Sequence, residues 1–311
     1  MSPGCEVSVV RGGLVESVHE VAVVAVAAGG AVVAETPGAA ALPVFLRSAA
    51  KPFQAEPAVR AGVLERLGLD DRHLALACAS HLGEDRHVAL AAEILAAAGL
   101  AVDALDCGRD DRPSPLHHMC SGNHALGLAL CVCEGWPTAG YLEPGHPLQA
   151  AMRAAVASTA GAVPEEAVDG CGMRAYRLPL HRYAALFGAL GSAAGALGRC
   201  SAAMRAHPEL VRGAGEIDTE LMRAEAGLVA KVGAEATIGI GLADGRGLAL
   251  KVRDGAWRAM EPTAVYAARI ALGVRADGDG LVRHATPPIM NARAEQVGSL
   301  VIRIALMGET T

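Results

Sequence analysis

The segment LRSAAKPFQA, residues 46–55, places Ser48 three positions before Lys51, among alanines and with a proline directly after the lysine. At the start of a helix, residues i and i+3 lie on one face, so the lysine amine is expected to reach the serine hydroxyl. Apolar neighbours would desolvate the amine and favour its neutral form. A neutral amine beside a hydroxyl is a nucleophile–base pair, so the segment predicts covalent catalysis by Ser48.

The choice of basic residues makes this lysine more distinctive. Of the 27 lysines and arginines in the chain, only Lys51, Lys231 and Lys251 are lysines. Arginine keeps its proton near neutral pH, whereas a buried lysine can release one and act as a base. Chance retention explains any single lysine equally well. Two of the three, however, lie in local contexts that favour a chemical role.

Two of the eight cysteines lie in glycine-containing turns, Cys120 in MCSGNH and Cys171 in DGCGM. A turn can present a thiolate to a metal ion. Neither cysteine belongs to a close C-x-x-C pair, so on their own these residues favour structural thiols over metal ligands. His124 follows Cys120 closely, and its type suits a ligand, a hydrogen-bond partner or a buried structural histidine.

Composition and charge exclude several classes of protein. A formal charge of −6 and scattered arginines argue against a nucleic-acid surface. The first residues, MSPGCEVSVV, lack a basic region followed by an apolar run, so no signal peptide is expected. The uncharged apolar stretch 21–34 is too short to span a membrane. We therefore expect a cytoplasmic protein.

The order of the predicted elements indicates the fold. Strands are expected at both ends of the chain and amphipathic helices in the middle, with Asp70 and Asp71 capping one of them. The predicted strands are 6–10, 20–28, 31–35, 236–244, 247–254 and 299–306, and the predicted helices are 73–79, 83–99, 121–135, 146–161, 180–193, 217–230 and 263–273. This order predicts an α/β fold in which an antiparallel sheet built from both chain ends accompanies a helical middle region. No long linker interrupts residues 1–311, so we expect one domain with a helical subregion at roughly 65–228.

Several segments in combination resemble the asparaginase II family, the class 3 L-asparaginases. They are RSAAKPFQA (47–55), ACASHLGEDRH (77–87), MCSGNH (119–124) and VDGCGM (168–173), and the resemblance continues through 135–149, 227–235 and 249–255. It therefore covers nearly the whole chain. It implies a fold like that of serine β-lactamases and glutaminases. The nucleophile motif of serine β-lactamases and penicillin-binding proteins is also S-x-x-K. It further implies a homodimer that hydrolyses L-asparagine to L-aspartate and ammonia, with no organic cofactor.

The resemblance also implies roles for individual residues. Ser48 and Lys51 match the first serine–lysine pair of the family, and Ser80 and Lys251 match its second set. The residues expected to contact the substrate are Arg47, Asp169 and His124.

The expected metal site departs from the family pattern. Cys120 and Cys171 match two of the family's three zinc ligands, but the third is a lysine and this chain has Asn123 at that position. An amide carbonyl is a weaker zinc ligand than a neutral amine. We therefore expect zinc binding to be weakened, unless another residue such as His124 supplies the third donor.

Three functions stay open at this point. The first is an L-asparaginase that uses a Ser–Lys nucleophile. The second is a diverged amidase or acyltransferase that acts on another small amide. The third is a non-catalytic binding protein on the same fold, against which the intact serine–lysine sets argue.

Overall fold

The computed structural model describes residues 4–109, 111–275 and 279–308, and the chain divides into two compact units. The first unit contains the residues up to Val44, Leu178–Ser192 and the residues from Glu220 onward. The second contains Phe45–Arg177 and Ala193–Thr219. Each unit therefore combines segments that are distant in the sequence. The expectation of one domain with a helical subregion stays a prediction.

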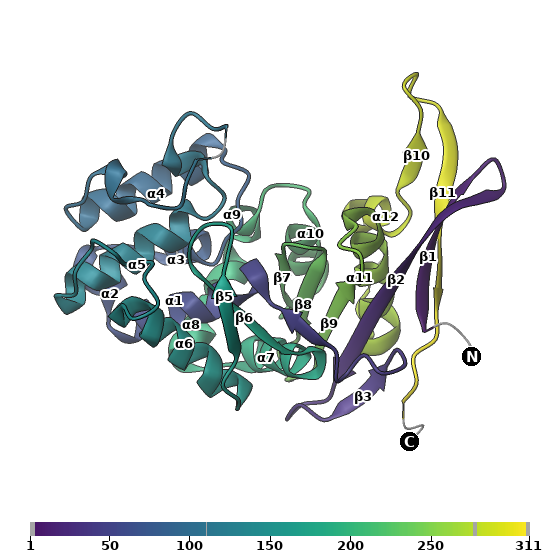
Figure 1. Cartoon of the computed structure of the whole chain (residues 1–311), viewed down its shortest axis with the longest axis horizontal. Coiled ribbons are helices and arrows are strands. Elements are labelled where there is room, and N and C mark those ends of the chain that lie inside the picture. The colour runs from purple at the N-terminus through teal and green to yellow at the C-terminus, as the bar shows by residue number, and fades with distance from the viewer. Residues whose placement is uncertain (1–3, 110, 276–278, 309–311) are drawn as a thin grey trace. The chain divides into compact units, whose positions relative to one another are not determined.

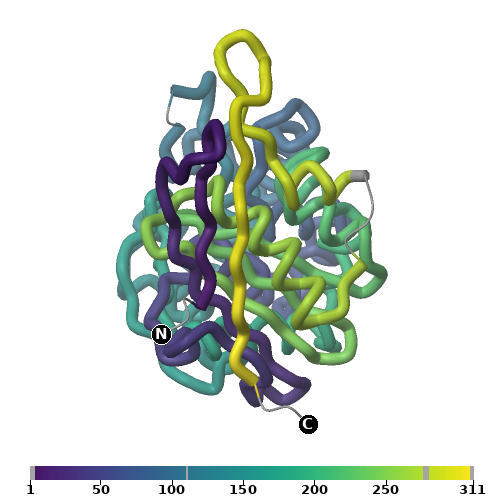
Figure 2. The backbone as a smooth tube through the Cα atoms, turned by 90° about the vertical axis from the view of Figure 1, so that its right-hand side faces the viewer, coloured from purple at the N-terminus to yellow at the C-terminus, as the bar shows by residue number. Residues whose placement is uncertain are grey.

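The first unit is organised around an antiparallel sheet whose strands come from both ends of the chain (Figure 1). In the described part of the chain, the strand order is β10–β11–β1–β2–β9–β8–β7, and β3 also pairs with β2. The strands are β1 (Cys5–Arg11), β2 (Leu14–Val26), β3 (Val32–Glu35), β7 (Val229–Gly233), β8 (Thr237–Gly241), β9 (Gly247–Val252), β10 (Pro288–Met290) and β11 (Gln296–Ile304). Figure 2 shows the yellow C-terminal β11 beside the purple N-terminal hairpin. The predicted fold class is confirmed.

Strand β2 is long and changes its environment along its length. Its residues 21–26 are buried and pair with β9, where helix α7 (Leu180–Ser192) packs against β2, β8 and β9. Glycines allow this close approach: a Cβ atom on Gly241 would lie only 1.8 Å from the carbonyl oxygen of Phe187. Residues 14–20 of β2 lie beyond this region and are mostly exposed. Helix α11 (Trp257–Leu272) also packs against the sheet and is joined by α12 (Asp279–Ala285).

The second unit is mostly helical. Its helices in the described residues include α1 (Lys51–Arg60), α2 (Val63–Leu67), α3 (Asp71–Ala77), α4 (Asp85–Ala97), α5 (Ser121–Glu134), α6 (Pro147–Ala160), α8 (Gly195–Ala206) and α9 (Pro208–Val211). Helix α1 packs against α5, α6 and α8, and β5 (Glu165–Val168) pairs with β6 (Arg174–Pro179). The chain also forms β4 (Pro43–Phe45) and α10 (Ile217–Ala224). None of the helices within the described ranges has the length and apolar character needed to cross a bilayer.

One predicted helix is wrong in its second half. The sequence predicted a helix over 217–230, but α10 ends at Ala224 and Val229–Gly233 forms the fully buried strand β7. A short apolar run that is buried on both sides lacks the alternation of a half-buried strand. Periodicity alone therefore cannot distinguish it from a buried helix.

Candidate active site

The residue before Ser48 has an uncommon backbone conformation. Arg47 has φ = 52°, in the left-handed region that residues other than glycine rarely adopt. Its guanidinium donates to Asp169 Oδ1 from Nη2 at 2.8 Å and from Nε at 3.1 Å. The backbone N–H of Gly170 donates to the same oxygen at 2.6 Å. Surrounding contacts must enforce such a conformation, which is enriched at functional sites. The two predicted substrate residues Arg47 and Asp169 therefore lie together, next to Ser48.

Ser48 does not make the contact that its spacing predicted. It lies in a short 3-10 turn, η1 (Arg47–Ala50), that leads into α1, and it is half-buried. Within the described part of the chain its hydroxyl has no hydrogen bond, because the Lys51 side chain extends toward other partners. The i, i+3 spacing places two residues on one face but does not fix the direction of a long, flexible side chain.

Lys51 is buried, with 3% of its surface exposed. Its Nζ donates to the carbonyl oxygens of Ala79 at 2.6 Å and Met119 at 3.4 Å. The same nitrogen lies 3.2 Å from both Ser80 Oγ and Cys120 Sγ. The amine therefore joins the loop after α3 to the start of α5. It also connects Ser80, predicted as catalytic, with Cys120, predicted as a metal ligand.

A buried histidine fixes the loop that carries Ser80. The backbone N–H of Ser80 donates to the Val211 carbonyl at 2.9 Å. Burial lowers the pKa of the neighbouring His81 well below its usual value, so the ring is neutral. Its Nδ1 accepts from the backbone N–H of Gly83 at 3.1 Å, and its Nε2–H therefore donates to Ser121 Oγ at 2.9 Å. His81 thus couples this loop to the first turn of α5.

The two thiols that were predicted as metal ligands are neighbours. Cys120 and Cys171 are both buried, and their side chains are hydrogen-bonded to each other. The hydrogen bond from Cys171 lowers the pKa of Cys120, and the charge of Lys51 acts in the same direction, against the effect of burial. The same hydrogen bond and burial raise the pKa of Cys171. Both shifts favour the thiolate form at Cys120 over the thiolate form at Cys171.

Asn123 and His124 are both buried in the first turn of α5. Asn123 Nδ2 donates to the Ala77 carbonyl at 3.0 Å, and its Oδ1 lacks a hydrogen-bond partner among the described residues. The Tyr141 hydroxyl accepts from the backbone N–H of Asp106 at 2.9 Å and donates to His124 Nδ1 at 2.7 Å. Burial lowers the pKa of His124 to about 3, so the ring is neutral. Tyr141 lies in the segment 135–149 that resembles the family, but no role for it was predicted from the sequence, and the fold brings it to His124.

The two cysteines supply fewer donors than a zinc ion requires. A stable zinc site uses three or four protein donors. In the ranges that the structure describes, no three His, Cys, Asp or Glu side chains are grouped to hold a metal ion. Lys51 contacts the sulfur of Cys120, and the side-chain amide nitrogen of Asn123 donates a hydrogen bond to the carbonyl oxygen of Ala77. In this arrangement the residues do not fit zinc, and no reaction step below depends on a metal.

Lys251 belongs to the first unit, where β9 positions it. It lies opposite Thr237 of β8 and Ala22 of β2. Its Nζ donates to the carbonyl oxygens of Glu235 and Val252, both at 2.5 Å. Glu235 has φ = 62°, so a left-handed turn presents one of these carbonyls. Burial lowers the pKa of Lys251, which brings its neutral form closer to working pH.

The described residues thus form a mixed α/β fold in which a buried lysine amine contacts a serine hydroxyl. The family model described as L-asparaginase II matches residues 7–302 of the 311-residue chain, and the chain belongs to this family. A search of curated proteins finds no match. Family membership supports an amidohydrolase type of function.

Proposed function

We propose that the protein is an L-asparaginase, which hydrolyses L-asparagine to L-aspartate and ammonia through a covalent acyl-enzyme. Membership of the L-asparaginase II family supports the reaction class. The observation that carries the proposal is the 3.2 Å contact between Lys51 Nζ and Ser80 Oγ in a buried setting. An amine beside a hydroxyl can exchange a proton with it, which Ser–Lys catalysis requires.

In the proposed reaction, the Ser48 hydroxyl attacks the side-chain amide carbon of asparagine. Its proton passes through Ser80 to Lys51, with which Ser80 is in contact. The C–N bond then breaks, ammonia leaves with a returned proton, and water hydrolyses the resulting ester to aspartate. Lys251 provides a second amine for proton transfer and substrate binding. Backbone N–H groups near Ser48 stabilise the oxyanion.

The pair of Arg47 and Asp169 suits the charged end of an amino acid. A guanidinium binds a carboxylate with paired hydrogen bonds, and a carboxylate accepts from an ammonium group. Both side chains are partly exposed, 25% for Arg47 and 15% for Asp169, so a ligand can reach them. In the complex, Arg47 would bind the α-carboxylate of asparagine and Asp169 would bind its α-ammonium group. The ion pair between the two side chains would either open or be kept alongside these contacts.

Ser80 is the competing nucleophile, because Lys51 contacts its hydroxyl and not that of Ser48. The two serines are distinguished by Ser48→Ala and Ser80→Ala, each mixed with L-asparagine, quenched and analysed by intact-protein mass spectrometry. We expect Ser48→Ala to lose both turnover and the acyl adduct. Ser80→Ala should keep the adduct while turnover falls by about 10²–10⁴-fold, the usual contribution of a proton-transfer group. Near wild-type turnover in Ser48→Ala would transfer the nucleophile role to Ser80.

A diverged amidase or acyltransferase is the second candidate, favoured by Asn123 at the family's lysine position. This change lies in the first turn of α5, close to Cys120. An altered side chain there can change substrate choice while the serines and lysines keep their chemistry. Ammonia release from a panel of small amides separates the candidates. Preference for another amide over asparagine supports the diverged enzyme, and no release from any amide supports a binding protein.

A further inference from the structure

Two strands share one edge of β2 and leave a gap between them. Strand β1 pairs with β2 as far as Glu20, and β3 begins to pair with it at Val24 (Figure 1). The other edge of β2 pairs with β9. In the described part of the chain, Val21 and Ala22 have no strand partner on the edge that β1 and β3 share. The sheet is therefore interrupted beside these two residues.

The segment after β11 closes this gap from the outside. The backbone N–H of Ala305 donates to the Gly4 carbonyl at 2.6 Å, and Met307 exchanges two backbone hydrogen bonds with Glu35 of β3. A Cβ atom on Gly4 would lie 2.4 Å from Cδ of Pro37, so glycine is needed where the chain before β1 passes the turn after β3. The start of β1, the middle of β2, the turn after β3 and the segment after β11 enclose a cavity of about 600 Å³.

The cavity reaches both faces of the sheet. Side chains alternate between the two faces of a strand, so Cys5 and Glu6 of β1 point to opposite sides, as do Glu20 and Val21 of β2. All four line the cavity. It therefore continues from a charged rim through the gap to an apolar floor, where Cys5 and Val21 are buried. Burial raises the pKa of the Cys5 thiol to about 12, so the floor carries no charge.

The rim carries three charged side chains that lack a partner. Glu6 and Glu20 lie directly opposite each other, which is unfavourable for like charges across a strand pair. Arg253 follows β9, and its backbone N–H donates to the Glu20 carbonyl at 2.9 Å. Within the described residues, none of these three side chains forms a hydrogen bond or an ion pair. The rim therefore presents two carboxylates and one guanidinium in a row about 10 Å long, at a strand spacing of about 4.8 Å.

A buried hydroxyl lies farther along the cavity. Thr36 is 4% exposed and lines the cavity, and its Oγ1 accepts from the backbone N–H of Val23 at 3.0 Å. The O–H of Thr36 has no acceptor among the residues that the structure describes. Val23 is three residues along β2 from Glu20, a distance of about 10 Å. The cavity thus has one buried donor at the end away from the charged rim.

We propose that this cavity binds a free aromatic α-amino acid. The α-ammonium lies between Glu6 and Glu20, the α-carboxylate is bound by Arg253, and the aromatic ring enters the gap above the apolar floor. A phenolic oxygen on the ring accepts from the hydroxyl of Thr36, so tyrosine binds more tightly than phenylalanine. One ligand thereby supplies the counter-charges that all three rim side chains lack. Cavities of about 300–1,000 Å³ hold drug-sized ligands, so an aromatic amino acid fits.

The inference goes beyond the proposed amide hydrolysis and does not depend on it. None of the residues proposed for catalysis or for binding of asparagine lines this cavity. Ser48→Ala should therefore bind the aromatic ligand as wild type does, whatever its effect on turnover.

Isothermal titration calorimetry of the full chain with L-phenylalanine tests the ligand class. We expect a dissociation constant below about 1 mM. N-acetyl-L-phenylalanine lacks the ammonium group and L-phenylalaninamide lacks the carboxylate, so each should bind at least tenfold more weakly. The amide also represents the first residue of a peptide. If it bound as tightly as L-phenylalanine, the site would recognise a chain N-terminus, and the proposal of a free amino acid would be wrong.

Three substitutions test the assigned contacts. Glu20→Gln and Arg253→Gln should each weaken binding of L-phenylalanine at least tenfold. The matched controls Glu16→Gln and Arg293→Gln change exposed side chains that are paired elsewhere, and they should have no effect. Thr36→Val should remove the preference for L-tyrosine over L-phenylalanine. Circular dichroism of each variant shows whether the sheet is retained.

Three results would overturn the proposal. The first is no binding of L-phenylalanine to wild type at about 10 mM. The second is binding that neither Glu20→Gln nor Arg253→Gln weakens. The third is complete displacement by an equal concentration of L-asparagine, which would place the ligand in the candidate active site. Equal affinity of wild type for L-tyrosine and L-phenylalanine would contradict the contact assigned to Thr36.

Discussion

Lys51 has two separable functions at the scale of the residue. Its amine is placed to exchange a proton with Ser80, and it also provides a donor for the buried carbonyl of Ala79 and contacts the sulfur of Cys120. A buried acceptor that loses its donor costs about 1–3 kcal/mol. Ser48, in contrast, has no side-chain hydrogen bond in the described residues. Its removal should therefore affect chemistry without affecting stability.

Lys51→Met should consequently lose both activity and stability. The substitution keeps most of the apolar stem but removes the amine. We expect turnover of L-asparagine to fall below detection and the free energy of unfolding to drop by about 1–3 kcal/mol. Urea unfolding followed by circular dichroism measures the second effect, and Ser48→Ala, with unchanged stability, is the control. A Lys51→Met protein as stable as wild type would show that the four contacts of the amine carry no net stabilisation.

Asn123 is the residue at which a metal site can be tested. Because Cys120 and Cys171 supply only two strong donors, we expect the unmodified protein to retain little zinc after dialysis. Asn123→Lys should add an amine donor next to them and raise the zinc content after dialysis, measured by elemental analysis. Asn123→Gln, which keeps an amide, is the control and should not raise it. Full zinc occupancy of the unmodified protein would show that the asparagine is harmless.

The sequence predicted some of these residue contacts and missed others for a physical reason. Lys51 was expected to be buried because its neighbours are apolar, and it is. Its partner was expected to be Ser48, three positions away, whereas the amine contacts Ser80, 29 positions away. Local spacing reports which residues share a helix face. Local spacing does not show which distant loop lies next to the end of the side chain in the folded protein.

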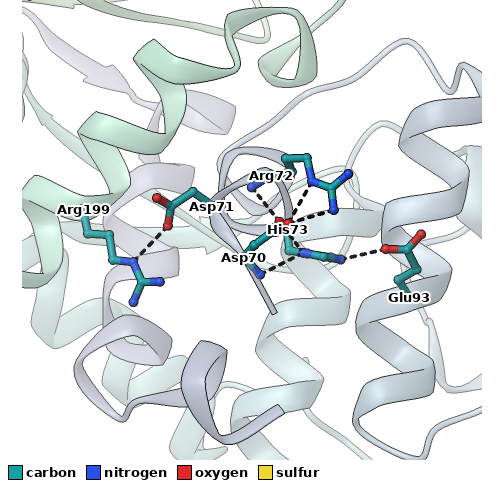
Figure 3. Close-up of polar contacts among 6 residues, drawn as sticks. All are labelled: Asp70, Asp71, Arg72, His73, Glu93 and Arg199. Atoms are coloured by element: carbon teal, nitrogen blue, oxygen red, sulfur yellow. Dashed lines mark hydrogen bonds and ion pairs between the residues drawn. The ribbon is translucent and has the colours of Figure 1, made fainter. Parts of the chain in front are cut away.

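At the scale of the element, α3 shows how a helix beginning is fixed. Asp70, predicted as a cap, accepts from the backbone N–H of Arg72 at 3.0 Å and from Arg72 Nε at 2.9 Å (Figure 3). His73 Nε2 lies 3.0 Å from a carboxylate oxygen of Glu93 on α4, and Arg199 of α8 donates to Asp71 at 3.0 Å. These contacts connect the first turn of α3 to two other helices. The helix therefore begins where the sequence predicted a cap.

The Asp70 charge should stabilise the protein only above a defined pH. Burial opposes the charged form, but hydrogen bonds from Arg72 and His73 outweigh it and lower the pKa of Asp70 from 3.8 to about 2. A lowered carboxyl pKa gives stability that is complete above the unfolded value and is lost as pH falls through the folded value. The contribution should therefore be present above about pH 4 and disappear between about pH 4 and 2.

Asp70→Asn tests this prediction, because asparagine keeps the cap acceptor and removes only the charge. The variant should be less stable than wild type by at most about 1 kcal/mol at pH 7, since the site is half exposed and screened. Urea unfolding at several pH values should show the difference shrinking below pH 4. A difference that stays constant down to pH 2 would mean that the charge contributes nothing.

At the scale of the whole molecule, the antiparallel sheet was predictable and the division into units was not. The strands predicted at both chain ends indicated an antiparallel sheet built from the two termini. The antiparallel pairing of β1 with β11 confirms this prediction. The chain leaves the first unit at Val44, returns for α7, leaves again and returns at Glu220. Nothing in the local pattern around residues 177–193 marks α7 as part of the sheet unit. The role of the glycines in α7 is visible only in the structure, where they allow the backbone around β8 and β9 to approach the helix closely.

The central claim is that this chain hydrolyses an amide by Ser–Lys chemistry. The most direct measurement is release of ammonia and aspartate from L-asparagine by the purified wild-type chain, with Ser48→Ala and Lys51→Met measured in parallel. We predict equal amounts of the two products from wild type and none from either variant. Absence of both products from the wild-type protein, or equal release by all three proteins, would contradict the account.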